Sequence, residues 1–484
     1  MRITAFLAYN GLPHTKELSD RLLKSGLVNE VYLVTTQNDV EELPGCKLLI
    51  GNSMQNSSTI KQISELSNTE YSLILSQDTQ IDFGQFAIER FIGVADDTSA
   101  GLVYSDYFEI KDGVSSIHPV IDCQKGSLRD DFEFGYILLF RSSVLKEVYS
   151  TVTVDYSFAA LYDLRLKVSQ KAELFRINEY LYSLIENDAR KSGEKLFDYV
   201  NPRNRQVQIE MEIACTEHLK AIGGYLKPEF KDINFSDIPF DIEASVIIPV
   251  KNRAKTISDA IESVLNQKTN FKFNLIIVDN YSDDGTTEII NEFKAKDNRI
   301  VHLIPERKDL GIGGCWNEAV HSSLCGKFAI QLDSDDLYYS ENTVQTVVDS
   351  FYEQKCAMVV GTYQMANFKL EEIPPGIIDH KEWTPENGRN NALRINGLGA
   401  PRAFYTPLLR KIKVPNVSYG EDYAVGLAIS REYQIGRIYT PVYICRRWDG
   451  NSDSALDIVK QNAHNTYKDR IRTIELIARI NRNK

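Results

Sequence analysis

Strand-length apolar segments alternate with amphipathic helix-length segments between residues 245 and 361, and this alternation constrains the fold more than any other feature. Strands are expected at residues 245–250, 275–278, 300–303 and 328–332. Helices are expected at residues 256–267, 286–296 and 313–324. Strands that alternate with helices pair in parallel and are covered on both faces. The pattern therefore predicts an α/β fold with a mostly parallel, doubly wound sheet that binds ligands at the carboxyl ends of its strands.

The first half of the chain repeats this plan. Strands are expected at residues 3–8, 31–35 and 71–75, and helices at residues 15–25, 57–67 and 83–94. Aligning the halves matches residues 71–79 with residues 328–336. We therefore expect two tandem α/β domains, at residues 1–185 and 242–484, with a C-terminal helix on the second and a helical linker at 186–241. Because common folds recur without shared ancestry, a merely similar first domain is the alternative.

Composition narrows the class of function. A net charge of −12 over 484 residues argues against a nucleic-acid partner. The seven cysteines are scattered and form no CxxC pair, which speaks against a disulfide framework or a structural zinc site and fits a reducing cytoplasm. The apolar N-terminal segment has the length of one strand, so we interpret it as a core strand rather than an export signal. We expect a cytoplasmic protein.

Three acidic groups follow predicted strands or open predicted helices in the second half. Asp333-Ser334-Asp335-Asp336 comes directly after the apolar run 328–332, Asp279 directly follows the strand 275–278, and Glu421-Asp422 follows Gly420. Acidic oxygens at the end of a buried strand suit a hard divalent cation with a bound diphosphate. The alternative for each group is a solvated turn or a helix cap.

Taken in order, these motifs resemble the family 2 glycosyltransferases of the GT-A fold over roughly residues 243–450. The resemblance rests on an opening strand that ends near a proline, an Asp-rich turn, a DxD motif and a late Glu-Asp pair. It implies transfer of a sugar from a UDP- or GDP-linked donor, with Mn²⁺ or Mg²⁺ at Asp333 and Asp335. It makes Asp422 the candidate general base, with Glu421 beside it, and implies inversion at the anomeric carbon.

The resemblance also marks residues for binding of the nucleotide sugar. They are Pro249, Asn252, Arg253, Asp279, Gly311, Asn317, Ser334, Arg446 and Arg447. The glycines at 311–314 would permit close approach of a ligand to the start of a helix. Residues 446–452 resemble a closing loop over the diphosphate, and residues 396–402 fall where family members position the acceptor or the donor sugar.

The first half lacks part of this chemistry in the alignment. Ser76 takes the place of Asp333, Asp78 matches Asp335, and Leu161 takes the place of Asp422. A leucine cannot accept a proton. We therefore expect residues 1–185 to form a degenerate, non-catalytic GT-A-like domain that supports the second domain or grips the acceptor.

The acceptor and the C-terminal tail each allow more than one interpretation. The acceptor is a sugar, a lipid-linked glycan or a small molecule, and the basic, Ile-containing tail from residue 468 either contacts an anionic membrane peripherally or packs on its own domain. The alternative functions are a nucleotidyltransferase or sugar-1-phosphate pyrophosphorylase, and a non-catalytic carbohydrate-binding scaffold. The first alternative usually has a glycine-rich opening loop, which residues 249–253 lack.

Overall fold

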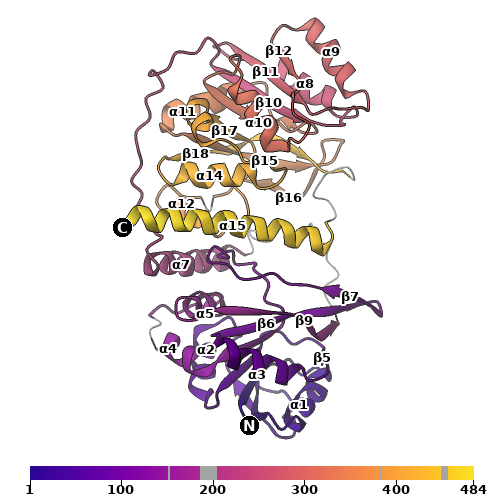
Figure 1. Cartoon of the computed structure of the whole chain (residues 1–484), viewed down its shortest axis with the longest axis vertical. Helices are drawn as coiled ribbons and strands as arrows, with labels where there is room; N and C mark the ends of the chain where they lie inside the picture. The colour runs from indigo at the N-terminus through magenta and orange to yellow at the C-terminus, as the bar shows by residue number, and fades with distance from the viewer. Residues whose placement is uncertain (151–152, 186–203, 382, 449–455) are drawn as a thin grey trace. The chain divides into compact units, whose positions relative to one another are not determined.

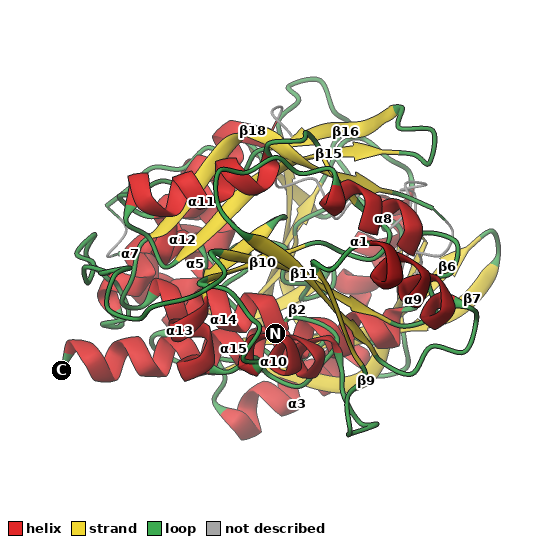
Figure 2. Ribbon diagram, turned by 90° about the horizontal axis from the view of Figure 1, so that it is seen from above, coloured by secondary structure: helices red, strands yellow, loops and turns green. Residues whose placement is uncertain are grey.

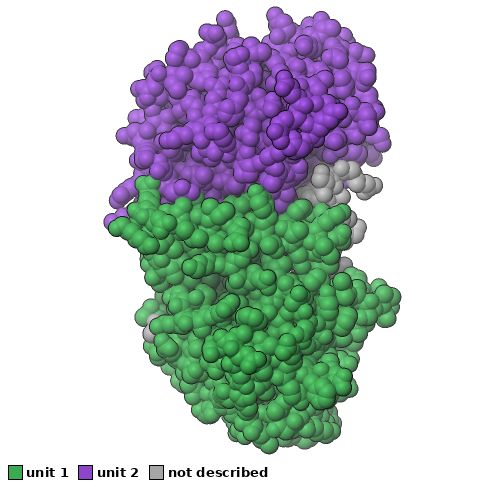
Figure 3. Space-filling model, in the orientation of Figure 1, with its two compact units in different colours: residues 1–225, 456–484 green, residues 226–455 purple. Residues whose placement is uncertain are grey.

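The computed structural model describes residues 1–150, 153–185, 204–381, 383–448 and 456–484. These residues form two compact units, unit 1 at residues 1–225 and 456–484 and unit 2 at residues 226–455 (Figure 3). The first part of the predicted linker, residues 186–203, and the closing loop from residue 449 lie outside the described residues.

Unit 1 is an α/β unit with one sheet (Figure 1). Its strands are β1 (Ile3–Ala8), β2 (Val28–Thr35), β3 (Cys46–Ile50), β4 (Tyr71–Leu75), β5 (Ile81–Phe83), β6 (Leu102–Lys111), β7 (Val114–His118), β8 (Ile137–Arg141) and β9 (Leu174–Ile185). Its helices are α1 (His14–Lys24), α2 (Ser57–Leu66), α3 (Ala87–Thr98), α4 (Ser142–Tyr149), α5 (Ala160–Ser169), α7 (Arg205–Ala221) and α15 (Ile458–Asn483).

Unit 2 has the same kind of architecture. Its strands are β10 (Ala244–Val250), β11 (Phe273–Asp279), β12 (Ile300–Leu303), β13 (Phe328–Gln331), β14 (Leu337–Tyr338), β15 (Met358–Ala366), β16 (Glu372–Ile378), β17 (Arg402–Tyr405) and β18 (Ile435–Arg446). Its helices are α8 (Ile257–Leu265), α9 (Thr286–Lys296), α10 (Ile312–His321), α11 (Thr343–Gln354), α12 (Gly388–Asn391), α13 (Thr406–Ile412) and α14 (Glu421–Ser430).

The two sheets share one strand order and one set of strand directions. Unit 1 runs β3-β2-β1-β4-β8-β6-β9-β5 and unit 2 runs β12-β11-β10-β13-β17-β15-β18-β14, with β7 on β6 and β16 on β15. Figure 2 shows β15, β16 and β18 as neighbours in unit 2. The parallel pairing expected from sequence holds around β1 and β10, whereas β8 and β17 run antiparallel to both of their neighbours, so each sheet is mixed. The expectation of tandem GT-A-like domains is confirmed at the level of topology.

Burial explains why the central strands form. All seven residues of β11 are buried, as expected for a strand covered on both faces. Helix α8 buries Ile257, Ala260, Ile261 and Val264, which share one face at helical spacing. Strand β12 and helix α9 begin and end at the residues expected from the sequence.

Helix α15 belongs to unit 1, which differs from the predicted domain at residues 242–484. Asp469 is fully buried and accepts a hydrogen bond from Ser127 Oγ at 2.8 Å, and Gly126 N donates to Thr473 Oγ1 at 3.0 Å. A Cβ at Gly126 would lie 2.2 Å from Thr473 N, so only glycine allows this approach. No helix in the described part of the chain combines the length and apolar character that a membrane crossing requires.

Candidate active site

The acidic loop after β13 carries the two predicted metal ligands. Asp333 Oδ1 accepts a hydrogen bond from Gln331 Nε2 at 2.8 Å, and Asp335 Oδ2 accepts one from Trp448 Nε1 at 3.2 Å. Burial raises the pKa of the Asp333 carboxyl, and the charges of Asp335 and Asp422 raise it further against an opposing effect of nearby arginine. The predicted metal ligands and the predicted base therefore belong to one electrostatic cluster.

The carboxylates of this cluster suit a divalent cation whose remaining ligands are phosphate oxygens. Among residues with described positions, no three His, Cys, Asp or Glu side chains form a group that could hold a metal alone. Asp333 and Asp335 supply carboxylates from one loop, and Mg²⁺ is commonly bound by one or two carboxylates together with substrate phosphates. Ser334 is buried and its carbonyl accepts a hydrogen bond from Thr256 Oγ1 at 2.9 Å, which fixes the backbone between the two aspartates.

Asp422 faces Arg402, the last residue of the stretch 396–402 that the resemblance places near the acceptor or the donor sugar. Arg402 Nη1 lies 2.6 Å from Asp422 Oδ2 and donates to Gly399 O at 2.6 Å. The Asp422 side chain keeps 24% of its surface exposed. It is therefore held by a cation while remaining reachable from solvent.

Glu421, beside the proposed base, has a different environment. It is the first residue of α14 after Gly420, whose positive φ of 78° suits glycine. Glu421 is 9% exposed, and its Oε2 has no hydrogen-bond partner among the described residues. Burial, assisted by the charge of Asp422, raises the pKa of Glu421 to about 7.

The glycines at the start of α10 contact the chain rather than an open ligand site. A Cβ at Gly313 would lie 1.8 Å from Pro415 O, and a Cβ at Gly311 would lie 2.7 Å from Val417 C. Asn317 Nδ2 donates to Val414 O at 2.7 Å, and its Oδ1 accepts from Val414 N at 3.0 Å. The sequence predicts that Gly311 and Asn317 bind nucleotide, but in the structure they contact the segment that leads to Gly420. The close approach that was predicted for a ligand is made instead by residues 415–418.

The predicted nucleoside-binding loops lie side by side at the ends of β10 and β11. Pro249 is within β10 opposite Val278 of β11. Asn252 Oδ1 accepts a hydrogen bond from Asp283 N at 2.9 Å, and Arg253 N donates to Thr286 Oγ1 at 2.8 Å. The two loops therefore form one connected surface at the carboxyl edge of the sheet.

Asp279 ends β11 but is fully buried. Its carboxylate accepts hydrogen bonds from Ser282 N at 3.0 Å and Thr287 Oγ1 at 2.5 Å, and His302 Nε2 lies 3.5 Å away. Burial alone would raise the pKa of Asp279, but these contacts outweigh burial and hold it well below the ordinary value. Asp279 thus organises the turn that starts α9, which is the cap-like alternative weighed from the sequence.

Arg446 is tied to the acidic loop. Its Nε donates to Asp335 O at 2.5 Å, its Nη1 contacts Asp259 Oδ2 at 2.7 Å, and its backbone N donates to Asp336 Oδ1 at 2.8 Å. Its side chain is 3% exposed. This buried position braces the metal-ligand loop, whereas Arg447, whose backbone N donates to Ala366 O, is half-buried beside it.

Unit 1 carries different residues at the equivalent positions. Helices α5 and α14 both have ten residues, so Ala160 and Leu161 stand where Glu421 and Asp422 stand. Asp78, the counterpart of Asp335, has a side chain only 2% exposed and accepts hydrogen bonds from Asn10 N at 2.6 Å and Thr15 Oγ1 at 2.8 Å. The carboxylate that unit 1 keeps at this motif therefore forms hydrogen bonds within unit 1.

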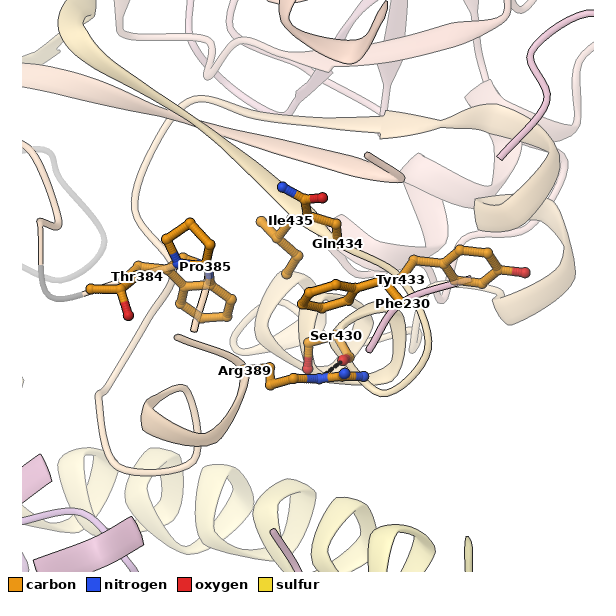
Figure 4. Close-up of a pocket in the computed structure, with 9 residues that line it drawn as sticks. Phe230, Thr384, Pro385, Arg389, Ser430, Tyr433, Gln434 and Ile435 are labelled. Carbon is orange, nitrogen blue, oxygen red and sulfur yellow. Dashed lines mark hydrogen bonds between the residues drawn. The ribbon is translucent and has the colours of Figure 1, made fainter. Parts of the chain in front are cut away.

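A small cavity lies at the other end of α14. It measures about 10 Å³, room for about one water molecule. Figure 4 shows Arg389 donating to Ser430 O, at 2.8 Å, in its wall. Because Ser430 follows Glu421 by nine positions, at about 1.5 Å of rise each, this cavity is separate from the carboxylate cluster. It is lined by Phe230, Trp383, Thr384, Pro385, Arg389, Ser430, Tyr433, Gln434 and Ile435.

Comparison with known proteins decides the family. The sequence model of glycosyl transferase family 2 matches residues 245–411. TuaG of Bacillus subtilis (strain 168), a glycosyltransferase assigned by name to teichuronic acid biosynthesis, is 31% identical over 190 residues, which are 39% of this chain and 72% of TuaG. The chain belongs to glycosyltransferase family 2.

Other relatives are matched over shorter parts of their length. An uncharacterized glycosyltransferase of Rickettsia felis is 30% identical over 200 residues, which are 41% of this chain and 32% of that relative, so the chain spans about a third of its length. The structure of S. aureus TarS 1–349 with UDP-GlcNAc has a TM-score of 0.37 and 21% identity, covering 49% of this chain and 72% of that one. The matched family 2 region includes Asp279, Asp333, Asp335 and Arg402, while Glu421 and Asp422 follow it.

Proposed function

We propose that unit 2 transfers a sugar from a UDP- or GDP-linked donor to a hydroxyl of a glycan, lipid-linked or small-molecule acceptor. The proposal is carried by one observation: Asp333 and Asp335 on one loop and Asp422 on α14 form a single electrostatic cluster. Family 2 membership supports sugar transfer, and the name of TuaG supports a place in polysaccharide biosynthesis.

In this proposal Asp333 and Asp335 would hold Mn²⁺ or Mg²⁺, which would offset the negative charge that develops on the leaving diphosphate. Trp448 and the Arg446 brace keep Asp335 and its backbone in place. The paired loops at Asn252 and Arg253 lie where the nucleoside is expected, and Arg447 is the remaining candidate for a phosphate contact.

Asp422 is the proposed general base. The acceptor oxygen attacks the anomeric carbon, the bond from that carbon to the diphosphate oxygen breaks, and the hydroxyl proton passes to Asp422. Direct displacement inverts the configuration at the anomeric carbon. The ion pair with Arg402 holds the Asp422 carboxylate in place for this step. Unit 1, with Leu161 and Ser76 at the corresponding positions, is proposed to have no turnover.

A panel of nucleotide sugars tests this function through release of nucleoside diphosphate with Mn²⁺. We expect release with one class of donor and a loss of at least ~100-fold in Asp333→Asn and in Asp422→Asn. Incubation with nucleoside triphosphates and sugar 1-phosphates should yield no pyrophosphate. Absence of release with every donor, or release unchanged in both variants, would favour the scaffold alternative.

A further inference from the structure

We propose that Arg402 is a positioning residue that, together with Gln331, holds the proton-accepting Asp422 in a fixed place relative to Asp333, the proposed metal ligand. The inference rests on the proposed sugar transfer and adds two residues to its machinery. Arg402 opens β17, and Gln331 is the last residue of β13, the strand beside it.

A chain of hydrogen bonds joins the two carboxylates. Gln331 Nε2 donates to Asp333 Oδ1 at 2.8 Å, and Gln331 Oε1 accepts from Arg402 N at 3.1 Å. Arg402 Nη1 then bridges Asp422 Oδ2 and Gly399 O, each at 2.6 Å. Because a flipped amide would set N–H against N–H and oxygen against carboxylate, both partners of Gln331 fix its orientation.

Unit 1 shows that the fold itself does not require this polar pair. Strand β17 pairs with β13 in the register in which β8 pairs with β4. In unit 2, Gln331 and Arg402 come next in this register after the pair Ile330 and Ala403. In unit 1, the residues at these two positions are Ile74 and Leu138. Both unit 1 residues are buried, so apolar side chains fill the same two positions of the same topology.

The carboxylates and the polar pair change together between the units. Ser76 stands at the position of Asp333 and Leu161 at the position of Asp422, in the unit where Leu138 replaces Arg402. Each end of the hydrogen-bonded chain and both of its links are therefore present in unit 2 and replaced at the matching positions of unit 1. This joint loss is expected if the links serve the carboxylates rather than the sheet.

Energetic considerations agree with a functional role. A guanidinium that keeps only 18% of its surface is expensive to desolvate, and apolar replacement of a buried ion pair is often neutral or stabilising. Stability therefore gives no reason for arginine at a position that accepts leucine. Arg402 instead orients the carboxylate of Asp422. One of its nitrogens bonds both Asp422 and the Gly399 carbonyl and so limits rotation of that carboxylate.

The test uses full-length protein with Arg402→Leu, Arg402→Lys and Gln331→Ile, the first and last copying unit 1. Steady-state release of nucleoside diphosphate gives kcat and KM for the donor, and thermal unfolding checks folding. We expect Arg402→Leu to fold, to lower kcat by about 100-fold and to leave the donor KM and the Mn²⁺ requirement within about twofold. Arg402→Lys should recover part of kcat, because an ammonium can reach one of the two oxygens.

Arg410→Leu is the matched control, because Arg410 hydrogen-bonds only to the carbonyls of Val320 and Ser322 in the described structure and should keep its kcat. An unchanged kcat in both Arg402 variants would overturn the inference while leaving the function standing. A raised donor KM with normal kcat would also overturn it, since Arg402 would then bind substrate. A wild-type protein inactive with every donor would instead overturn the proposed function.

Discussion

Replacing Glu421 by glutamine should remove a pH-dependent loss of stability from unit 2. The Glu421 carboxyl is buried, and its pKa is raised from 4.5 to about 7 by burial and by Asp422. Below pH 4 the group is protonated in both the folded and the unfolded chain, so it has no effect. Between pH 4.5 and 7 the unfolded chain releases this proton while the folded chain keeps it, and the free energy of unfolding falls as the pH rises.

The expected size follows from the same shift. A rise in pKa from 4.5 to about 7 corresponds to at most about 3 kcal/mol of stability lost between pH 4 and pH 8. Because part of this shift comes from the neighbouring charge of Asp422, we expect about 1–3 kcal/mol. Glutamine does not titrate, so its own contribution adds an offset that is the same at every pH.

Tryptophan fluorescence gives an assay for unit 2 alone, because Trp316, Trp383 and Trp448 all lie in it. Urea unfolding of wild type and Glu421→Gln is followed at pH 5 and pH 8 without divalent cation. The difference in unfolding free energy between the two proteins should shift by about 1–3 kcal/mol in favour of the variant at pH 8. A difference that is equal at both pH values would refute the environment assigned to Glu421.

Two further predictions concern packing and the division of labour between the units. Gly313→Ala would set a methyl 1.8 Å from Pro415 O, so it should displace the segment before α14, lower kcat and destabilise unit 2 by about 1–3 kcal/mol, as seen by urea unfolding and diphosphate release. Normal activity in this variant would contradict the role given to residues 415–418. Asp78→Ala removes hydrogen bonds to Asn10 and Thr15 and should destabilise unit 1 by about 2 kcal/mol in circular dichroism, with diphosphate release per folded protein unchanged. A matching fall in kcat would show that unit 1 takes part in turnover.

Much of the fold could be predicted from sequence because apolar residues recur at the regular spacing of strands and helices. The elements at residues 286–296 and 300–303 are found as α9 and β12 with the bounds expected. The strands beyond β13 were harder, because antiparallel pairing of β17 with β13 and β15 joins segments whose order in the chain does not reveal their neighbours. The placement of α15 was missed for a similar reason, since its hydrogen bond to Ser127 joins residues 342 positions apart.

The site was partly readable. The acidic motifs stood out by composition and order, and the structure brings Asp333, Asp335 and Asp422 into one cluster. Arg402 lies in the stretch 396–402 that the resemblance marks for positioning a sugar, but its link to Asp333 through Gln331 could not be predicted, because it depends on the register between residues 71 positions apart. The one available signal was internal: aligning residues 137–141 with residues 401–405 would have set Leu138 against Arg402. The glycines near Gly313 were linked to a ligand because sequence does not show that Pro415 makes the approach.

Binding of Mn²⁺ in the presence of the nucleoside diphosphate, followed by electron paramagnetic resonance, tests the central claim most directly when it is paired with turnover. The account predicts that wild type and Asp422→Asn bind the ion equally well, that Asp333→Asn does not bind it, and that both variants lose turnover. Tight binding of Mn²⁺ by Asp333→Asn, or full turnover by Asp422→Asn, would contradict the separate roles given to the two carboxylates.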